Sequence, residues 1–385
     1  MSEISGRLRE LYEFIRELYG REGRIALHEP VFRGNEKKYL ADCIDTTYVS
    51  SVGEYVDRFE SMMQEITGAR FAVATMNGTA ALHLALVVAG VRDGDEVITQ
   101  PLSFVATCNA IAYQRAHPVF VDVDADTLGM SPDALQAFLE TSCERVDGEC
   151  RHRRTGRRVA AVVPMHTFGL PCRIEELARL CARWGLALVE DAAESLGAKI
   201  GTRHTGTFGR IGAFSFNGNK TVTSGGGGCI VTDDEALARR AKHLSTTAKE
   251  SHRWEFRHDE VGFNYRLPNL NAALACAQLE QLDGFLANKR VTAQAYIRRC
   301  DALGVPVARE RPGTTSNYWL NAVFAADEGE RDAFLAYCND AGVMARPAWK
   351  LMNELPAFAA AACAPIPNAK FGAERLVNLP SSVRR

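Results

Sequence analysis

From residue 70 onward the chain alternates between short apolar segments and longer segments with helical spacing of apolar residues. An apolar segment at 71–75 precedes an Ala/Leu-rich helix candidate at 78–88, and a second strand candidate at 96–99 precedes a helix candidate at 105–113. Strands joined through helices run parallel, and a parallel sheet is covered by helices on both faces. The pattern therefore predicts an α/β fold with a largely parallel, doubly covered sheet. Further strand candidates lie at 119–123, 159–163, 187–189, 213–216 and 229–231.

The two ends of the chain follow other patterns. Residues 3–20 and 54–67 repeat apolar side chains at helical spacing, and long helical patterns cover 234–248 and 270–300. A separate set of strand and helix candidates follows these helices. Since a chain of this length usually forms more than one domain, we divide it into parts. The predicted parts are an N-terminal helix and arm (1–30), a large domain (31–262) and a small C-terminal α/β domain (263–385).

The composition is that of an ordinary globular enzyme, with 385 residues, 46% hydrophobic and 24% charged, and a net charge of −2. This balance gives no electrostatic reason to expect nucleic acid or membrane binding. No apolar run predicts a transmembrane span, and the charge-rich start lacks a secretory pattern. The eleven cysteines are scattered, and Cys143, Cys150 and His152 lack a fourth ligand at zinc spacing. We therefore expect a cytoplasmic protein with free thiols and no metal.

A polar, arginine-rich stretch at 141–158 separates a helix candidate from the next strand candidate. We interpret it as an insertion loop whose charges face solvent. Contact with an anionic substrate is the alternative.

A phosphate site is indicated where the first strand candidate meets its helix. Gly78 and Thr79 lie at this junction, and the N–H groups of a helix N-terminus bind anions. Glycine lets the backbone approach such a group closely. Ser215, at the end of another strand candidate, can offer a hydroxyl to the same group. An ordinary strand-to-helix turn is the alternative.

Two strand candidates end on residues suited to a flat heteroaromatic cofactor. Phe104 follows one strand and can stack on a ring, although a core position is the alternative. Asp191 ends a buried-type strand, at the edge where open α/β sheets bind ligands. A carboxylate there can keep a pyridine nitrogen protonated, and Glu194 lies three residues further on. A helix N-cap is the alternative for Asp191.

Lys220 lies in a polar turn after the strand candidate at 213–216, with Asn217 before it and four glycines at 225–228 after it. A lysine that can form a Schiff base, together with a carboxylate that can pair with a pyridinium nitrogen, is what pyridoxal phosphate (PLP) requires. The glycine run is not a P-loop, because no Gly-Lys-Ser/Thr follows it. No Gly-x-Gly-x-x-Gly follows the first strand candidate, which argues against a nicotinamide dinucleotide.

Four motifs resemble those of the DegT/StrS-type sugar-nucleotide aminotransferases. They are Asn-Gly-Thr-Ala-Ala-Leu at 77–82, Glu-Asp-Ala-Ala-Glu-Ser-Leu-Gly-Ala at 190–198, Ser-Phe-Asn-Gly-Asn-Lys at 215–220 and Gly-Phe-Asn-Tyr-Arg-Leu at 262–267. The resemblance implies PLP fold type I, the aspartate aminotransferase-like fold. Its large domain carries a mostly parallel seven-stranded sheet, and a small C-terminal α/β domain follows.

The resemblance also implies a role for each matching residue. Lys220 would be the Schiff-base lysine and proton shuttle, Asp191 would pair with the pyridine nitrogen, and Phe104 would stack on the ring. The phosphate would be held by Gly78, Thr79, Ser215 and, from the partner of a homodimer with shared active sites, Asn264. Glu194, where the family often has Gln or His, would approach the ring hydroxyl, and Asn217 stands where the family often has His.

A narrower resemblance, to the LegC-type subgroup, is carried by Leu-His-Glu-Pro-Val-Phe at 27–32, Gly-Asn-Glu-Lys-Lys-Tyr at 34–39 and Ser-Asn-Tyr-Trp-Leu-Asn at 316–321. It implies transfer of an amino group from L-glutamate to the C4 ketone of a nucleotide-linked 2-acetamido-2,6-dideoxy-4-hexulose, in bacterial surface-polysaccharide synthesis. Amination at C3 is the main alternative. A PLP-dependent sugar dehydratase and a non-catalytic binding protein are less well supported, because Lys220 and Asp191 are both present and the cysteines do not cluster.

Charged and aromatic residues elsewhere are candidates for the nucleotide-sugar pocket, since arginine can bind a diphosphate and aromatic rings can stack on a base. These candidates are Arg33, Tyr318, Trp319, Arg346 and Trp349.

Overall fold

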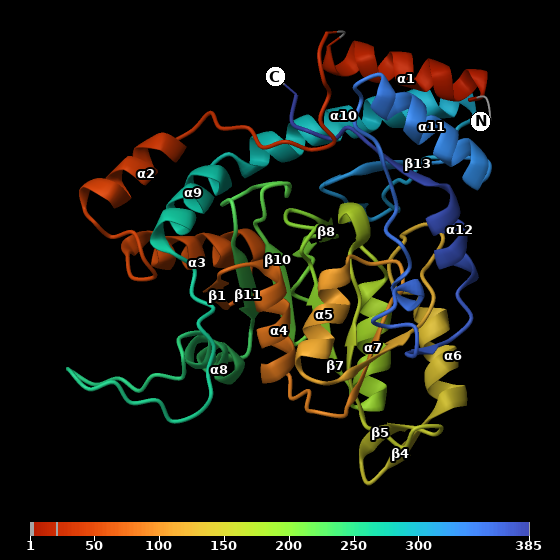
Figure 1. Cartoon of the computed structure of the whole chain (residues 1–385). Coiled ribbons are helices and arrows are strands. Elements are labelled where there is room, and N and C mark those ends of the chain that lie inside the picture. Colours follow the sequence, from red (N-terminus) through yellow and green to blue (C-terminus); the bar gives the residue numbers. More distant parts are fainter. Residues whose placement is uncertain (1–3, 21, 385) are drawn as a thin grey trace.

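The computed structural model describes residues 4–20 and 22–384, and an eight-stranded sheet lies at its centre (Figure 1). The strands lie in the order β1-β11-β10-β7-β6-β2-β3-β15. All of them run parallel except β11, which is antiparallel to both of its neighbours. The predicted α/β class with a mostly parallel sheet is therefore confirmed. The strands are β1 (Phe71–Thr75), β2 (Glu96–Thr99), β3 (His117–Phe120), β6 (Val159–Val163), β7 (Ala187–Asp191), β10 (Ile211–Ser215), β11 (Gly228–Thr232) and β15 (Ala362–Cys363).

The prediction of seven strands is wrong by one, because β15 adds an eighth strand at the sheet edge. β15 pairs in parallel with β3 through Ala362–Val119 and Cys363–Phe120. It has only two residues and comes from the C-terminal third of the chain. A segment this short carries no period-two pattern, so only its place in the fold identifies it as a strand.

Helices cover both faces of the sheet because successive strand residues point to opposite sides. On one face, α4 (Gly78–Val88), α5 (Val105–Tyr113) and α8 (Glu235–Ser245) pack on a set of side chains that includes Val73, Val97 and Ala213. The opposite face is divided between two pairs of helices. α3 (Glu54–Thr67) and α9 (Asn269–Leu279) cover one part, and α6 (Pro132–Ser142) and α7 (Ile174–Trp184) cover the other.

The C-terminal part contains a second, antiparallel sheet of β13 (Asn321–Phe324), β16 (Leu376–Leu379) and β14 (Arg346–Pro347). The N-terminal helix α1 (Gly6–Tyr19) packs here, on α10 (Leu282–Leu303) and α11 (Glu328–Asp340), through Leu11, Ile15 and Phe334 (Figure 1). The remaining elements are α2 (Glu36–Asp45), α12 (Pro367–Arg375), β4 (Cys143–Val146), β5 (Glu149–His152), β8 (Lys199–Ile200), β9 (Arg203–His204), β12 (Thr314–Thr315) and two 3-10 turns, Thr167–Gly169 and Met352–Glu354. Among the helices of the described residues, none is long and apolar enough to cross a bilayer.

The stretch at 141–158 contains a β-hairpin, so its interpretation as a loop is wrong. β4 and β5 are joined by Asp147 and Gly148, which both have positive φ (51° and 83°). Asp-Gly is a strong signal for this type of two-residue turn, and it was present in the sequence. His152 fixes the hairpin to the sheet, because its Nδ1 lies 2.7 Å from Glu96 Oε2 and both side chains are buried.

A long arm leaves the body of the molecule after α8 (Figure 1). Its two sides are joined by isolated bridges between Thr246 and Asn264 and between Lys249 and His258. Trp254 and Phe256 lie on this arm and are 69% and 78% exposed. The arm therefore presents large apolar side chains away from the rest of the chain.

Candidate active site

A cavity of about 330 Å³ lies where the carboxyl ends of several parallel strands meet. β1, β7 and β10 end at this edge of the sheet, and the segment after β2 also reaches it. Ligands of open α/β sheets bind at this edge. Most of the predicted site residues line the cavity: Gly78, Thr79, Phe104, Asp191, Glu194, Ser215, Asn217, Lys220, Trp319 and Trp349.

One end of the cavity is suited to an anion. Asn77 caps α4, and its Oδ1 accepts the N–H of Ala80 at 2.8 Å. The N–H groups of Gly78 and Thr79, in the first turn, have no intrahelical acceptor and lie at the positive end of the helix dipole. A Cβ on Gly78 would lie 2.6 Å from Ser215 Cβ, so glycine permits α4 to begin this close to β10. A phosphate group would find backbone N–H groups and a hydroxyl here.

Asp191 ends β7 as a fully buried carboxylate. Its Oδ2 accepts a hydrogen bond from Thr107 Oγ1 at 2.7 Å, and its Oδ1 accepts one from Ala193 N–H at 3.2 Å. Burial raises the pKa of Asp191, while these two donors, Lys220 and His166 act in the opposite direction. The N-cap alternative is wrong, because a turn rather than a helix follows this residue. A buried carboxylate that lines a cavity is suited to bind a cationic ring nitrogen.

Lys220 and Glu194 form a pair inside the cavity. Lys220 Nζ lies 3.4 Å from Glu194 Oε1 and 4.0 Å from the centroid of the Trp319 ring. The second oxygen of Glu194, Oε2, accepts the N–H of Phe168 at 2.9 Å. Burial raises the pKa of Glu194 to about 7, although Lys220 opposes the shift. Glu194 can therefore exchange a proton near neutral pH.

Aromatic rings form one wall of the cavity. The ring centroid of Phe104 lies 6.3 Å from that of Trp349, which in turn lies 5.1 Å from that of Phe168. Phe104 is 49% exposed, so the core position considered from the sequence is wrong. Its ring is free to pack against a bound heteroaromatic group.

Four predicted site residues lie outside this cavity, and the roles of all the predicted site residues stay predictions. Arg33 is exposed, and Asn264 lies on the arm, where its Oδ1 accepts a hydrogen bond from Arg266. The Tyr318 hydroxyl lies 3.4 Å from the backbone nitrogen of Glu310. Arg346 is exposed on β14 and bonds to a side chain of α11.

Three residues that shape the site were not among the predicted site residues, although Asn317 lies in the motif at 316–321. Thr107, on α5, supports Asp191. Phe168 adopts a left-handed backbone conformation (φ 56°), which directs its N–H to Glu194. Asn317 donates to the backbone oxygens of Glu194 and Leu196, each at 2.9 Å. These contacts join segments far apart in the chain, so no local pattern could predict them.

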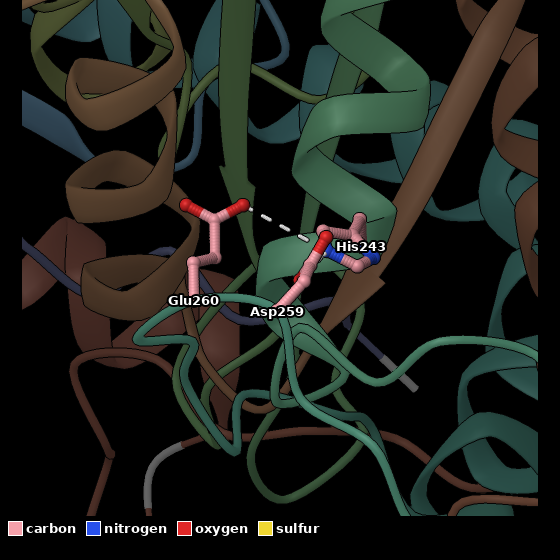
Figure 2. Close-up of side chains that lie close together, drawn as sticks. All are labelled: His243, Asp259 and Glu260. Atoms are coloured by element: carbon pink, nitrogen blue, oxygen red, sulfur yellow. Dashed lines mark hydrogen bonds and ion pairs between the residues drawn. The ribbon is translucent and has the colours of Figure 1, made fainter.

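His243, Asp259 and Glu260 have the spacing of potential metal ligands and lie at the base of the arm (Figure 2). His243 Nε2 lies 2.7 Å from Asp259 Oδ1 and 3.7 Å from Glu260 Oε1. Two guanidinium nitrogens of Arg240, Nη1 and Nη2, bind the Glu260 carboxylate. Because this guanidinium already neutralises the carboxylate, we assign the cluster to fastening the arm onto α8.

The fold and the cavity together define a class of protein. An anion site at a helix N-terminus, a buried carboxylate, a lysine and an aromatic wall match the phosphate, the pyridine nitrogen, the aldehyde and the ring of PLP. These residues therefore define a PLP-dependent enzyme as the class of protein.

The chain belongs to the DegT/DnrJ/EryC1/StrS aminotransferase family, whose model matches residues 30–384. It is therefore a PLP-dependent sugar-nucleotide aminotransferase, and the predicted family, enzyme class and cofactor are confirmed.

Similar proteins agree with this assignment. The chain is 35% identical over 334 residues to the GDP-perosamine synthase of Escherichia coli O157:H7, with 87% of each chain covered. It is 36% identical to the putative pyridoxal phosphate-dependent aminotransferase EpsN of Bacillus subtilis strain 168, over 87% of this chain and 84% of that protein. The crystal structure of the aminotransferase TlmJ from Streptoalloteichus hindustanus superposes with a TM-score of 0.84 at 28% identity, covering 93% of this chain and 94% of that one.

Proposed function

We propose that this enzyme transfers an amino group from L-glutamate to the C4 ketone of a nucleotide-linked 2-acetamido-2,6-dideoxy-4-hexulose. The observation that carries the proposal is the presence of Lys220, Asp191 and the α4 N-terminus in one cavity. Similarity to GDP-perosamine synthases supports a nucleotide-linked sugar and favours C4 over C3. The acetamido group rests on the LegC-type motifs alone, and the panel below tests UDP, GDP and dTDP as the nucleotide.

Several residues that line the cavity have a part in the proposed reaction. Bound PLP supplies an electron sink and carries the amino group between the two substrates. Lys220 Nζ takes the proton from Cα of the donor and later delivers a proton to C4 of the sugar. Asp191 keeps the pyridine nitrogen protonated, and Phe104 packs on the ring. Gly78, Thr79 and Ser215 hold the phosphate, with Asn217 beside them.

The proposed assembly is a homodimer in which the arm of one subunit reaches the cavity of the other. The exposed Trp254 and Phe256 support this proposal, because side chains of this size are usually covered. Asn264 on the arm would then bind the phosphate of the partner's cofactor. Arg33, Tyr318, Trp319, Arg346 and Trp349 remain candidates for sugar-nucleotide contacts, in a cytoplasmic enzyme of surface-polysaccharide synthesis.

The test uses purified enzyme, L-glutamate and a panel of GDP-, UDP- and dTDP-linked 4-keto and 3-keto sugars, with and without a 2-acetamido group. We expect amination of a 4-keto sugar and its complete loss in Lys220→Ala. Lys199→Ala, which removes an exposed lysine of β8, is the matched control and should retain activity. Preference for a 3-keto sugar would show amination at C3, and activity in Lys220→Ala would disprove the assignment of the lysine.

A further inference from the structure

The Lys220–Glu194 pair is enclosed by the protein. The side chains of Lys220 and Glu194 are only 12% and 1% exposed. A buried ion pair loses much of the hydration that stabilises its charges. Transfer of one proton from Nζ to Oε1 would convert it to a neutral amine and a neutral acid, with no change in net charge. Burial therefore favours the neutral form of this pair relative to the same pair in water.

Glu194 is held in a position to accept that proton. Its Oε2 is bound by the N–H of Phe168, whose φ of 56° is an uncommon backbone conformation for a bulky residue. Asn317 holds the backbone oxygen of the same glutamate at 2.9 Å. These contacts leave Oε1 facing Lys220 Nζ at 3.4 Å.

The other charged groups near Glu194 also favour its protonation. Asp191 acts on it as a second buried negative charge and opposes ionisation of Glu194. Asp191 has its own donors, in Thr107 Oγ1 and Ala193 N–H. Lys220 acts in the opposite direction on Glu194, and it loses its charge when the proton moves.

We propose that Glu194 is the base that deprotonates Lys220, and so generates the neutral amine that reacts with the cofactor aldehyde. An Nζ–H bond breaks and an Oε1–H bond forms. The Nζ lone pair then bonds to the aldehyde carbon, and the aldehyde oxygen leaves as water with the two remaining Nζ protons. Glu194 returns its proton to the nitrogen of the resulting C=N bond, and no oxidation or reduction occurs. This inference rests on the proposed role of Lys220.

The experiment mixes apoenzyme with PLP and follows the visible absorbance of the lysine-bound cofactor from about pH 6 to about pH 9, a range centred near the neutral optimum for a general base. Glu194→Gln keeps the size of the side chain and its acceptor for Phe168 N–H, but it cannot take up a proton. We expect the absorbance to appear about 100-fold more slowly than in wild type at neutral pH, and to recover in alkaline solution. Quenching of tryptophan fluorescence, which reports docking of PLP before bond formation, should keep its wild-type rate.

Glu175→Gln, which removes an exposed acid of α7, is the matched control and should behave as wild type. Wild-type rates across the pH range in Glu194→Gln would overturn the proposal. If Glu194→Gln melts at a clearly lower temperature, Glu194→Ala is assayed with and without added formate. A rate of absorbance change restored by formate supports the proposal, and an unchanged rate overturns it. Lys220→Ala tests the underlying function separately, since visible absorbance in that variant would disprove the role of the lysine itself.

Discussion

At the scale of single residues, Lys289 of α10 shows how a buried charge supports the site from outside it. Its side chain is fully enclosed, with 1% exposure. Nζ lies within hydrogen-bond distance of Trp319 O (3.2 Å), Ser381 O (2.5 Å) and His28 Nε2 (3.1 Å). Lys289 thereby joins the segments that contain His28 and Ser381 to Trp319, whose ring contacts Lys220. Nothing in the sequence distinguishes Lys289 from other lysines, because a lysine on a helix is usually exposed.

Lys289 should make the stability of the protein depend on pH. Burial lowers the pKa of Lys289 to about 7, whereas it is about 10.4 in the unfolded chain. Between these values the unfolded chain binds one proton more than the folded chain, so the stability contributed by this residue rises with pH. We compare wild type with Lys289→Met. The difference between their free energies of unfolding, wild type minus variant, should rise by about 1.4 kcal/mol per pH unit over this window. Urea titrations at several pH values measure it, and a constant difference would contradict the prediction.

At the scale of elements, the start of α4 decides how close the proposed phosphate site lies to β10. A Cβ at Gly78 would lie 2.6 Å from Ser215 Cβ and 3.3 Å from its Cα, which belongs to the backbone of a central strand. Helix and strand would have to separate to accept it. The same glycine belongs to the first turn that offers N–H groups to an anion.

Gly78→Ala should therefore lower both stability and cofactor affinity. We expect a loss of about 1–3 kcal/mol in the free energy of unfolding, as for other overpacked sites. We also expect weaker binding of PLP. Thermal melts and equilibrium titration with PLP measure the two effects. Gly284→Ala on α10 is the control, since its Cβ meets nothing within 4 Å and should stabilise the helix by about 0.5–1 kcal/mol.

At the scale of the whole molecule, the arm that extends from α8 is supported by few contacts with its own chain. Its base is held by His243 and the carboxylates of Asp259 and Glu260 (Figure 2), and Arg240 also binds Glu260. Its tip presents Trp254 and Phe256 to solvent. A long exposed arm is explained if a second copy of the chain covers it.

Replacing both Trp254 and Phe256 with serine should weaken that assembly without unfolding the subunit, because neither side chain belongs to a core cluster. We expect light scattering to give a monomer mass for the double variant and a dimer mass for wild type. PLP should also dissociate faster from the variant, if the partner's arm completes the phosphate site. A monomeric wild-type protein, or a variant that remains dimeric, would contradict the prediction.

The sequence by itself determined the local features: alternation of strand and helix predicted the parallel sheet. Gly78, Asp191, Ser215 and Lys220 were predicted as site residues because each lies at the end of a strand or shortly after it. The parallel strands bring these residues to one edge, so a one-dimensional pattern was sufficient. Only the tertiary structure decided which groups surround them. β15, Thr107 beside Asp191, Phe168 beside Glu194 and Lys289 beneath Trp319 come from distant segments. Their contacts depend on packing, which residue spacing does not encode, and packing also decides which charges are buried and exchange protons near neutral pH.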